Sequence, residues 1–199
     1  TGSGSYTGIS FSNGSAHWPD RIQPALNMIN IRIILFLLAA TLGLFLLLRV
    51  QGKLETPASP LGILSMEFAT QPHRVTEIKT AWDAEGMTGR AKNNIWIDFL
   101  FIPFYAMLFY TLCGSISVRM HGFPAKLGIF LAFGALVAGL LDVLENIFML
   151  FALQGHYGGF SALATSLLAG AKFLLLALAA LYVVPLGLRL LVMKLATGK

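Results

Sequence analysis

The sequence predicts an all-α polytopic membrane protein: a four-transmembrane-helix bundle with an amphipathic interfacial helix between the first and second spans. Hydrophobic residues make up 56% of the 199 residues and charged residues only 12%, whereas about 25% of the residues of a soluble domain are charged. The apolar residues are gathered into four long runs that contain few charges. These two observations exclude an ordinary soluble domain and a disordered chain.

The first predicted span covers residues 28–50, and its apolar core lies between Arg32 and Arg49. A run of this length can cross a hydrocarbon core of ~30 Å, for which ~20 residues are needed. A signal peptide is the alternative, but the run is long for one and the residues after Arg49 form a poor cleavage site. We therefore expect a retained helix. The Gly- and Ser-rich residues 1–27 are expected to form a flexible tail.

Between the first and second spans, apolar residues recur at a three-to-four spacing over residues 60–82, which is typical of an amphipathic helix. The apolar positions are Leu61, Leu64, Phe68, Val75, Ile78 and Trp82, and Glu67, Arg74, Glu77 and Lys79 lie on the other side. Pro72 predicts a break or kink within this stretch. We expect the helix to lie at the membrane interface or to cap the bundle; a lid over a site below it is the functional alternative.

Three further spans are predicted at residues 94–120, 127–153 and 160–188. The connections between them are short, so neighbouring helices are antiparallel and residues 28–199 form a single four-helix domain. The connection 154–159 has no Lys or Arg, whereas Arg119, Lys126 and Arg189 lie at the opposite ends of the spans. By the positive-inside rule both termini are then cytoplasmic, with Trp82 and Trp96 at the outer interface.

Polar residues inside the predicted spans are the candidates for function, because ionisable groups are costly within a bilayer. They are Asp98 and Tyr105 in the second span, Asp142, Glu145 and Asn146 in the third, and Lys172 in the fourth. A rise of ~1.5 Å per residue places Asp98 ~6 Å from the outer helix ends and the other ionisable groups and Tyr105 ~12–18 Å from them. Each set lies on a helix face rich in small residues, so we expect them to meet in the interior.

These polar residues have structural and functional explanations. Asp142 and Lys172 can form an ion pair that sets helix register, Asp98 can stabilise the first turn of its helix, and Tyr105 and Asn146 can be hydrogen-bonded core residues. Three carboxylates nevertheless face one lysine, so at least one acid must be protonated, solvated through a cavity, or paired with a loop cation. Arg90 and Lys92 are the candidates for that pairing.

We expect neither a metal nor a cofactor, because no histidine lies in a span. His73, His121 and His156 are predicted to be surface residues, and Cys113 a small buried hydrophobe. The net charge of +5 comes from basic residues at the helix ends, without a basic patch. This pattern argues for topology signals and against a nucleic-acid partner.

Three segments, LGILSMEFA (61–69), DFLFIPFY (98–105) and GLLDVLEN (139–146), resemble a pattern found in small bacterial four-helix membrane proteins of unassigned function. The resemblance covers residues 61–190 and implies a bacterial inner (plasma) membrane, but it implies no activity. The layout is also loosely similar to the sterol-isomerase and sigma-2-receptor group, which has four helices and acidic residues in a membrane cavity.

Two functional hypotheses follow. In the first, Asp142, Glu145, Asn146, Lys172, Asp98 and Tyr105 line a polar, acidic intramembrane pocket that handles a lipid-like or cationic small molecule, or protons. In the second, the protein is a non-catalytic accessory or scaffold subunit of a larger membrane complex, and the polar cluster is structural. The lipid bilayer is a partner in both, and a homo-oligomer or larger complex is expected. Nothing in the sequence identifies a reaction, so a binding protein is favoured over an enzyme.

Overall fold

The computed structural model describes residues 31–51 and 53–197. In this part of the chain the helices are α2 (Ile31–Gln51), α3 (Ile63–Glu67), α4 (Pro72–Ala84), α5 (Thr88–Ser117), α6 (Phe123–Leu153) and α7 (Gly159–Thr197), and no β-strand occurs. Four of them, α2, α5, α6 and α7, are long and apolar enough to cross a membrane. The prediction of an all-α chain with four long apolar helices is confirmed. The predicted flexible tail over residues 1–27 lies outside the described residues.

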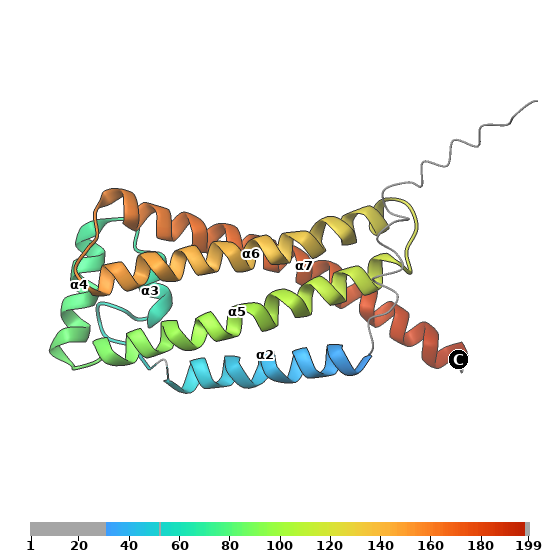
Figure 1. The fold of residues 1–199 in the computed structure, drawn as a ribbon, viewed down its shortest axis with the longest axis horizontal. Helices are drawn as coiled ribbons and strands as arrows, with labels where there is room; N and C mark the ends of the chain where they lie inside the picture. The colour runs from blue at the N-terminus through green and yellow to red at the C-terminus, as the bar shows by residue number, and fades with distance from the viewer. Residues whose placement is uncertain (1–30, 52, 198–199) are drawn as a thin grey trace, which may run out of the picture.

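The long helices run roughly side by side, and α3 and α4 lie at one end of them (Figure 1). α5 packs against α6, α6 against α7, and α2 against α5. Tight turns reverse the chain between the last three helices, and Gly122 and Gly155 adopt positive φ angles of 67° and 89° in those turns, which glycine reaches at little cost. We call residues 53–87, which contain α3 and α4, the cap.

The observed helix bounds differ from the predicted ones in the cap. The stretch 60–82 is not one helix: α3 ends at Glu67 and α4 begins at Pro72, so the predicted break at Pro72 is confirmed. Gln71 is extended, with φ −125° and ψ 140°, because a residue before proline avoids the helical conformation. Among the long helices, α5 begins at Thr88 rather than residue 94, and α7 continues to Thr197 rather than ending at 188.

Small residues bring α5, α6 and α7 close together. The predicted stripe on α6 is buried along its whole length: Gly128, Ala132, Ala135, Gly139, Asp142, Asn146 and Met149. Gly139 faces Ala106 and Ile102 of α5, and Gly128 faces Tyr182 of α7 and Ser117 of α5. Close backbone approach of this kind is what small residues permit between apolar helices. It leaves the polar residues of α6 pointing into the bundle.

We predict that Gly128→Ala destabilises the bundle by about 1–3 kcal/mol, because overpacking forces neighbours to move. A Cβ atom at residue 128 would lie 2.2 Å from the Tyr182 hydroxyl oxygen and 2.8 Å from Ser117 Cβ. The Tyr182 hydroxyl cannot retreat freely, since it donates a hydrogen bond to Pro124 O at 3.0 Å. Thermal unfolding in detergent measures the effect. Gly134→Ala is the matched control on the same helix, with its nearest contact at 3.6 Å; equal melting temperatures for the two variants would contradict the prediction.

α2 is the peripheral helix. Leu37 is the one buried residue between Ile31 and Val50, and large apolar side chains such as Phe36 and Leu46 are more than 60% exposed. The face that contacts α5 is a single stripe. Among the described residues, nothing covers its other apolar surface, as expected for a helix that faces lipid.

Several single-residue predictions can now be compared with the fold. His73, His121 and His156 are exposed and Cys113 is buried, as predicted. Trp96 is 62% exposed, whereas the Trp82 side chain is fully buried. The position of both residues at the outer membrane interface stays a prediction. Trp82 packs inside the cap, where its indole N–H finds hydrogen-bond acceptors.

Candidate functional site

A buried lysine on α7 lies at the centre of the candidate site. Lys172 Nζ is 2.6 Å from Asp142 Oδ1 and 2.8 Å from Glu145 Oε2, both on α6. The side chains of all three residues are at least 94% buried. The sequence spacing explains the pairing, because Asp142 and Glu145 are three residues apart and share a helix face. Two of the predicted residues therefore meet the predicted lysine directly.

A third carboxylate reaches the same lysine from the cap. Glu67, the last residue of α3, lies with its Oε2 3.6 Å from Lys172 Nζ, and its side chain is only 8% exposed. The prediction that placed Glu67 on the polar side of an amphipathic helix is therefore wrong. α3 ends before Pro72, so Glu67 need not follow the face defined by Val75, Ile78 and Trp82. Burial raises the pKa of Glu67 above its ordinary value, and the positive charge of Lys172 opposes that rise.

The remaining predicted residues complete the cluster through hydrogen bonds. The Tyr105 hydroxyl on α5 donates to Asp142 Oδ2 at 2.8 Å. One turn away, Asn146 Nδ2 on α6 donates to Asp98 Oδ2 on α5 at 2.7 Å. The structure thus brings all six predicted residues to one level of the bundle, and Glu67 joins them. We call these seven residues the polar cluster.

The polar cluster has more negative than positive groups. Glu67, Asp98, Asp142 and Glu145 are four carboxyl groups, and Lys172 is the basic residue among them. The ion pairs found within residues 31–51 and 53–197 do not join Asp98 to Arg90 or Lys92, the loop cations considered above. The surplus acid of the sequence therefore remains after folding, and Glu67 adds to it.

Hydrogen bonding in the polar cluster is also incomplete. Glu67 Oε2 and both carboxylate oxygens of Glu145 are buried and receive no hydrogen bond from the described residues. Lys172 Nζ is at ion-pair distance from Glu145 but does not have hydrogen-bond geometry toward it. Buried carboxylates are normally satisfied by several donors. These oxygens can therefore accept protons, but as buried atoms they are not exposed to a molecule in the cavity.

A cavity of about 400 Å³ lies against the polar cluster. Its polar wall includes Glu67, Asp98, Tyr105, Asp142, Asn146 and Lys172, and its apolar wall includes Phe45, Leu48, Leu64, Phe101, Phe173 and Leu176. The volume falls within the range of ~300–1,000 Å³ that holds small-molecule ligands. Residues of α2, α3, α5, α6 and α7 all contribute, so the cavity exists only in the assembled bundle.

Two basic residues line the cavity at the end of α2. Arg49 on α2 and Lys53 after it both line the cavity and are exposed. Asn94 on α5 fixes this end of α2, because its Nδ2 donates to the carbonyl oxygen of Leu48 at 3.1 Å, one of the last four carbonyls that a helix leaves unsatisfied. In the sequence, Arg49 has the position of a topology signal at a helix end, and no pattern marks Asn94. Nothing in their spacing relates either residue to the later spans.

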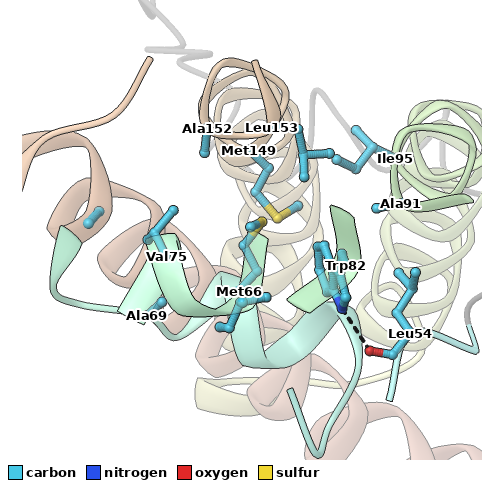
Figure 2. Close-up of a cluster of buried hydrophobic side chains, with 12 residues drawn as sticks. Leu54, Met66, Ala69, Val75, Trp82, Ala91, Ile95, Met149, Ala152 and Leu153 are labelled. Carbon is cyan, nitrogen blue, oxygen red and sulfur yellow. Dashed lines mark hydrogen bonds between the residues drawn. The ribbon is translucent and has the colours of Figure 1, made fainter. Parts of the chain in front are cut away.

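The cap holds Glu67 in place through a buried apolar core. Met66, next to Glu67, packs with Met149 of α6 beside Trp82 (Figure 2). Trp82 Nε1 donates hydrogen bonds to Leu54 O and to Ser59 Oγ, each at 2.9 Å. These contacts join the loop before α3 to α4 and to the end of α6. The cap is therefore packed onto the bundle and covers the polar cluster from one end.

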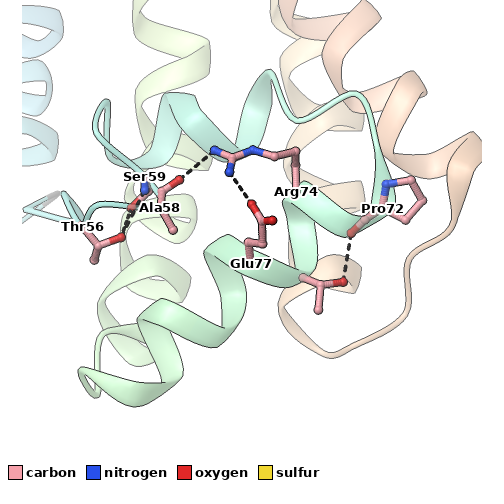
Figure 3. A network of polar contacts seen from close by, with 7 residues as sticks. Thr56, Ala58, Ser59, Pro72, Arg74 and Glu77 are labelled. Carbon is pink, nitrogen blue, oxygen red and sulfur yellow. Dashed lines mark hydrogen bonds and ion pairs between the residues drawn. The ribbon is translucent and has the colours of Figure 1, made fainter.

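Polar contacts stiffen the outer side of the cap (Figure 3). Arg74 ion-pairs with Glu77 and donates a hydrogen bond from Nη2 to Ala58 O at 3.0 Å. Thr56 and Ser59 pair through their side-chain oxygens at 2.9 Å. A second link to the bundle is aromatic: Phe68 stacks on Phe173 of α7 with ring centroids 6.0 Å apart. The loop 54–59, α3 and α4 thus form one unit above the cavity.

In the described part of the chain, no group of three His, Cys, Asp or Glu residues has the geometry to hold a metal ion. The Lys172 ammonium lies where a cation would bind among Glu67, Asp142 and Glu145. The arrangement can accept protons at its buried carboxylates, and it can bind a hydrogen-bond donor or a cation where Glu67, Asp98 and Asp142 line the cavity. No family model, no curated protein and no solved structure matches this chain.

Proposed function

We propose that the protein is an integral membrane protein that binds a small amphipathic molecule in the 400 Å³ cavity, with the ligand's cationic or hydrogen-bond-donating group at the polar cluster. The observation that carries this proposal is the lining of the cavity. Apolar side chains of the four long helices and of the cap meet Glu67, Asp98, Asp142 and Lys172 in the wall of the cavity, and Glu145 lies behind that wall against Lys172.

The cavity has an apolar part and an acidic part, and this arrangement supports an amphipathic ligand over a purely polar one. Phe45 and Leu48 of α2 stand on one side and Phe173 and Leu176 of α7 on another, and the carboxylates lie between α5, α6 and the cap. Ligand sites combine apolar walls with a few polar groups that fix orientation. A hydrocarbon chain matches the first part of this lining, and an ammonium group matches the second.

The surplus of carboxylates supports a cationic group. A buried charge is costly unless it is paired, and Lys172 cannot neutralise Glu67, Asp142 and Glu145 together. A ligand cation near Asp98 or Glu67, which line the cavity, would lower that cost, because charge-assisted hydrogen bonds to carboxylates are strong.

The alternative role, an accessory or scaffold subunit, receives less support. The observation that favours it is the small-residue stripe on α6, which could receive a partner helix. That stripe is already occupied within the chain, because Gly128 contacts Tyr182 and Gly139 contacts Ala106. Exposed apolar surface on α2 suits lipid as well as protein.

Glu145→Gln tests the proposed function. Glu145 is fully buried against Lys172, with its Oε2 2.8 Å from the ammonium. The isosteric amide removes one negative charge from behind the cavity wall and leaves Lys172 paired with Asp142; the melting temperature without ligand shows whether the fold is retained. We expect the affinity for dodecylamine, measured by native mass spectrometry and thermal shift, to fall about tenfold, which is the loss of roughly 1.4 kcal/mol of attraction. Glu77→Gln, an exposed carboxylate of the cap, is the control. Equal dodecylamine binding by both variants and the unaltered protein would refute the proposal.

A further inference from the structure

The cavity has two charged regions of opposite sign. The polar cluster is rich in carboxylates, whereas Arg49 and Lys53 line the cavity at the end of α2. Neither Arg49 nor Lys53 forms an ion pair with the described residues. Glu55 is the one acidic residue that lines the cavity in the loop beside them. The two basic groups are therefore available to an anionic part of a ligand.

The helices fix the distance between these regions. The hydrogen bond from Asn94 to Leu48 O sets this end of α2 level with residue 94 of α5. Asp98 lies one turn further along α5, which corresponds to ~6 Å along the helix axis. Measured along the helix axes, Arg49, which is adjacent to Leu48, is therefore about one helical turn from Asp98. A ligand that spans the two regions carries its anionic and cationic groups a few atoms apart.

The apolar walls indicate where the rest of the ligand lies. Phe45 on α2 is 49% exposed and Phe173 on α7 is 41% exposed, although both line the cavity. The packing of α2 is mainly on α5, so the cavity reaches the surface along the α2 and α7 side. In a membrane that side faces lipid, and a hydrocarbon chain can leave the cavity there without contacting water.

From these placements we infer that the ligand is a zwitterionic phospholipid with a primary amine, its ammonium at Asp98, its phosphate at Arg49 and Lys53, and its acyl chain between α2 and α7. The inference rests on the proposed function and narrows its ligand class. The primary amine follows from the polar wall of the cavity, which includes the carboxyl groups of Asp98 and Glu67. An ammonium can donate hydrogen bonds to carboxylate oxygens there, which a quaternary amine cannot do.

Glu67 and Asp98 are acidic residues of the cavity wall. The Glu67 side chain is 8% exposed, and its Oε2 is buried, receives no hydrogen bond from the described residues and lies 3.6 Å from Lys172 Nζ. Asp98 Oδ2 accepts a hydrogen bond from Asn146 Nδ2. Because Lys172 is shared among three carboxylates, a ligand cation in the cavity would balance negative charge that the lysine leaves over.

Binding of three single-chain phospholipids tests the inference. The purified full chain is titrated with lysophosphatidylethanolamine, lysophosphatidylcholine and lysophosphatidylglycerol, and with dodecylamine as a chain with a cation but no phosphate. We expect the ethanolamine lipid to bind about tenfold more tightly than each of the other two phospholipids. The choline headgroup has no N–H donor, and the glycerol headgroup has no positive charge to place near Asp98 and Glu67. Equal affinity for the three phospholipids would overturn the inference.

Variants separate the two charged regions. Asp98→Asn should remove the preference for the ethanolamine lipid over the glycerol lipid. Arg49→Gln with Lys53→Gln should weaken the ethanolamine lipid about tenfold while dodecylamine binding is retained. Arg90→Gln with Lys92→Gln is the control, because neither residue lines the cavity; an equal loss in this control would overturn the phosphate assignment.

The binding data distinguish failure of the phospholipid assignment from failure of the proposed function. If the protein binds dodecylamine but does not distinguish the phospholipid headgroups, the zwitterionic ligand is wrong and the proposed function stands. If it binds neither dodecylamine nor any of the lipids, the proposed function itself is wrong.

Discussion

Replacing Lys172 with methionine is expected to lower the free energy of unfolding by about 3–5 kcal/mol, which is the usual cost of removing one partner from a buried ion pair. Lys172 Nζ lies within 4 Å of three carboxylates, on α6 and on the cap. Methionine has a similar length but supplies no charge. Asp142, Glu145 and Glu67 would then repel one another at the centre of the bundle, and loss of folded protein from membranes is the extreme result.

Two comparisons separate this effect from a general intolerance of substitution. Lys79→Met removes the ion pair with Asp83 on α4, where the Asp83 side chain is 46% exposed, and should have little effect. Adding Asp142→Asn and Glu145→Gln to Lys172→Met should restore much of the stability, because the uncompensated charges are then gone. Thermal unfolding in detergent measures all three proteins. An unchanged melting temperature for Lys172→Met alone would show that the cluster is not held by its lysine.

The same variant should have a distinctive pH dependence. Burial raises the pKa of Glu67 above 4.5, and Lys172 works against that rise. A carboxyl with a higher pKa in the folded state contributes stability at low pH, and this contribution is lost as pH rises through the raised value. Without Lys172 the pKa of Glu67 rises further, so Lys172→Met should lose more stability than the unaltered protein as pH rises above 4.5.

Replacing Trp82 with alanine is the second change with a large expected effect, about 3–5 kcal/mol for truncation of a buried tryptophan. Trp82, a residue of α4, is fully buried near Met66 of α3 and the loop at Leu54 (Figure 2). Its indole N–H donates hydrogen bonds to Leu54 O and Ser59 Oγ. Without the indole, the cap should separate from the bundle more readily, and Glu67 would leave Lys172.

Limited proteolysis with trypsin measures this opening, because Arg74 and Lys79 lie in the cap. Trp82→Ala should be cleaved there much faster than the unaltered protein, and Trp82→Phe, which keeps most of the packing, should lose only about 1 kcal/mol with the hydrogen bonds. Trp96→Ala is the matched control, since Trp96 is 62% exposed. If Trp82→Ala and Trp96→Ala were cleaved at the same rate, the cap would not depend on Trp82.

The long helices and the inward-facing residues of the polar cluster could be predicted from sequence. Helical spacing puts Asp142 on the same face as Gly139 and Asn146, and a charge in an apolar run must turn toward a partner. Depth along each helix then placed Lys172 and Tyr105 at the same level as Asp142.

The contribution of the cap could not be predicted in the same way. Glu67 lies in an apolar stretch whose period continues across Pro72, so the pattern suggested one helix with Glu67 on its outer face. The break at residues 68–71 turns α3 independently of α4 and brings Glu67 to Lys172. The burial of Trp82 could likewise not be predicted, because the loop at Leu54 and Ser59 that covers it has no periodic signal. Such contacts are tertiary, and periodicity reports only which face of an element is apolar.

The central claim is that the cavity beside the polar cluster holds an amphipathic molecule. An experimental structure of the full chain purified from native membranes into lipid nanodiscs tests it most directly. We predict elongated non-protein density in the cavity, with its polar end within hydrogen-bond distance of Asp98 or Glu67 and its apolar end between Phe45 and Leu176. A cavity that contains only water, or that is closed by α2 packed onto α7, would contradict the claim.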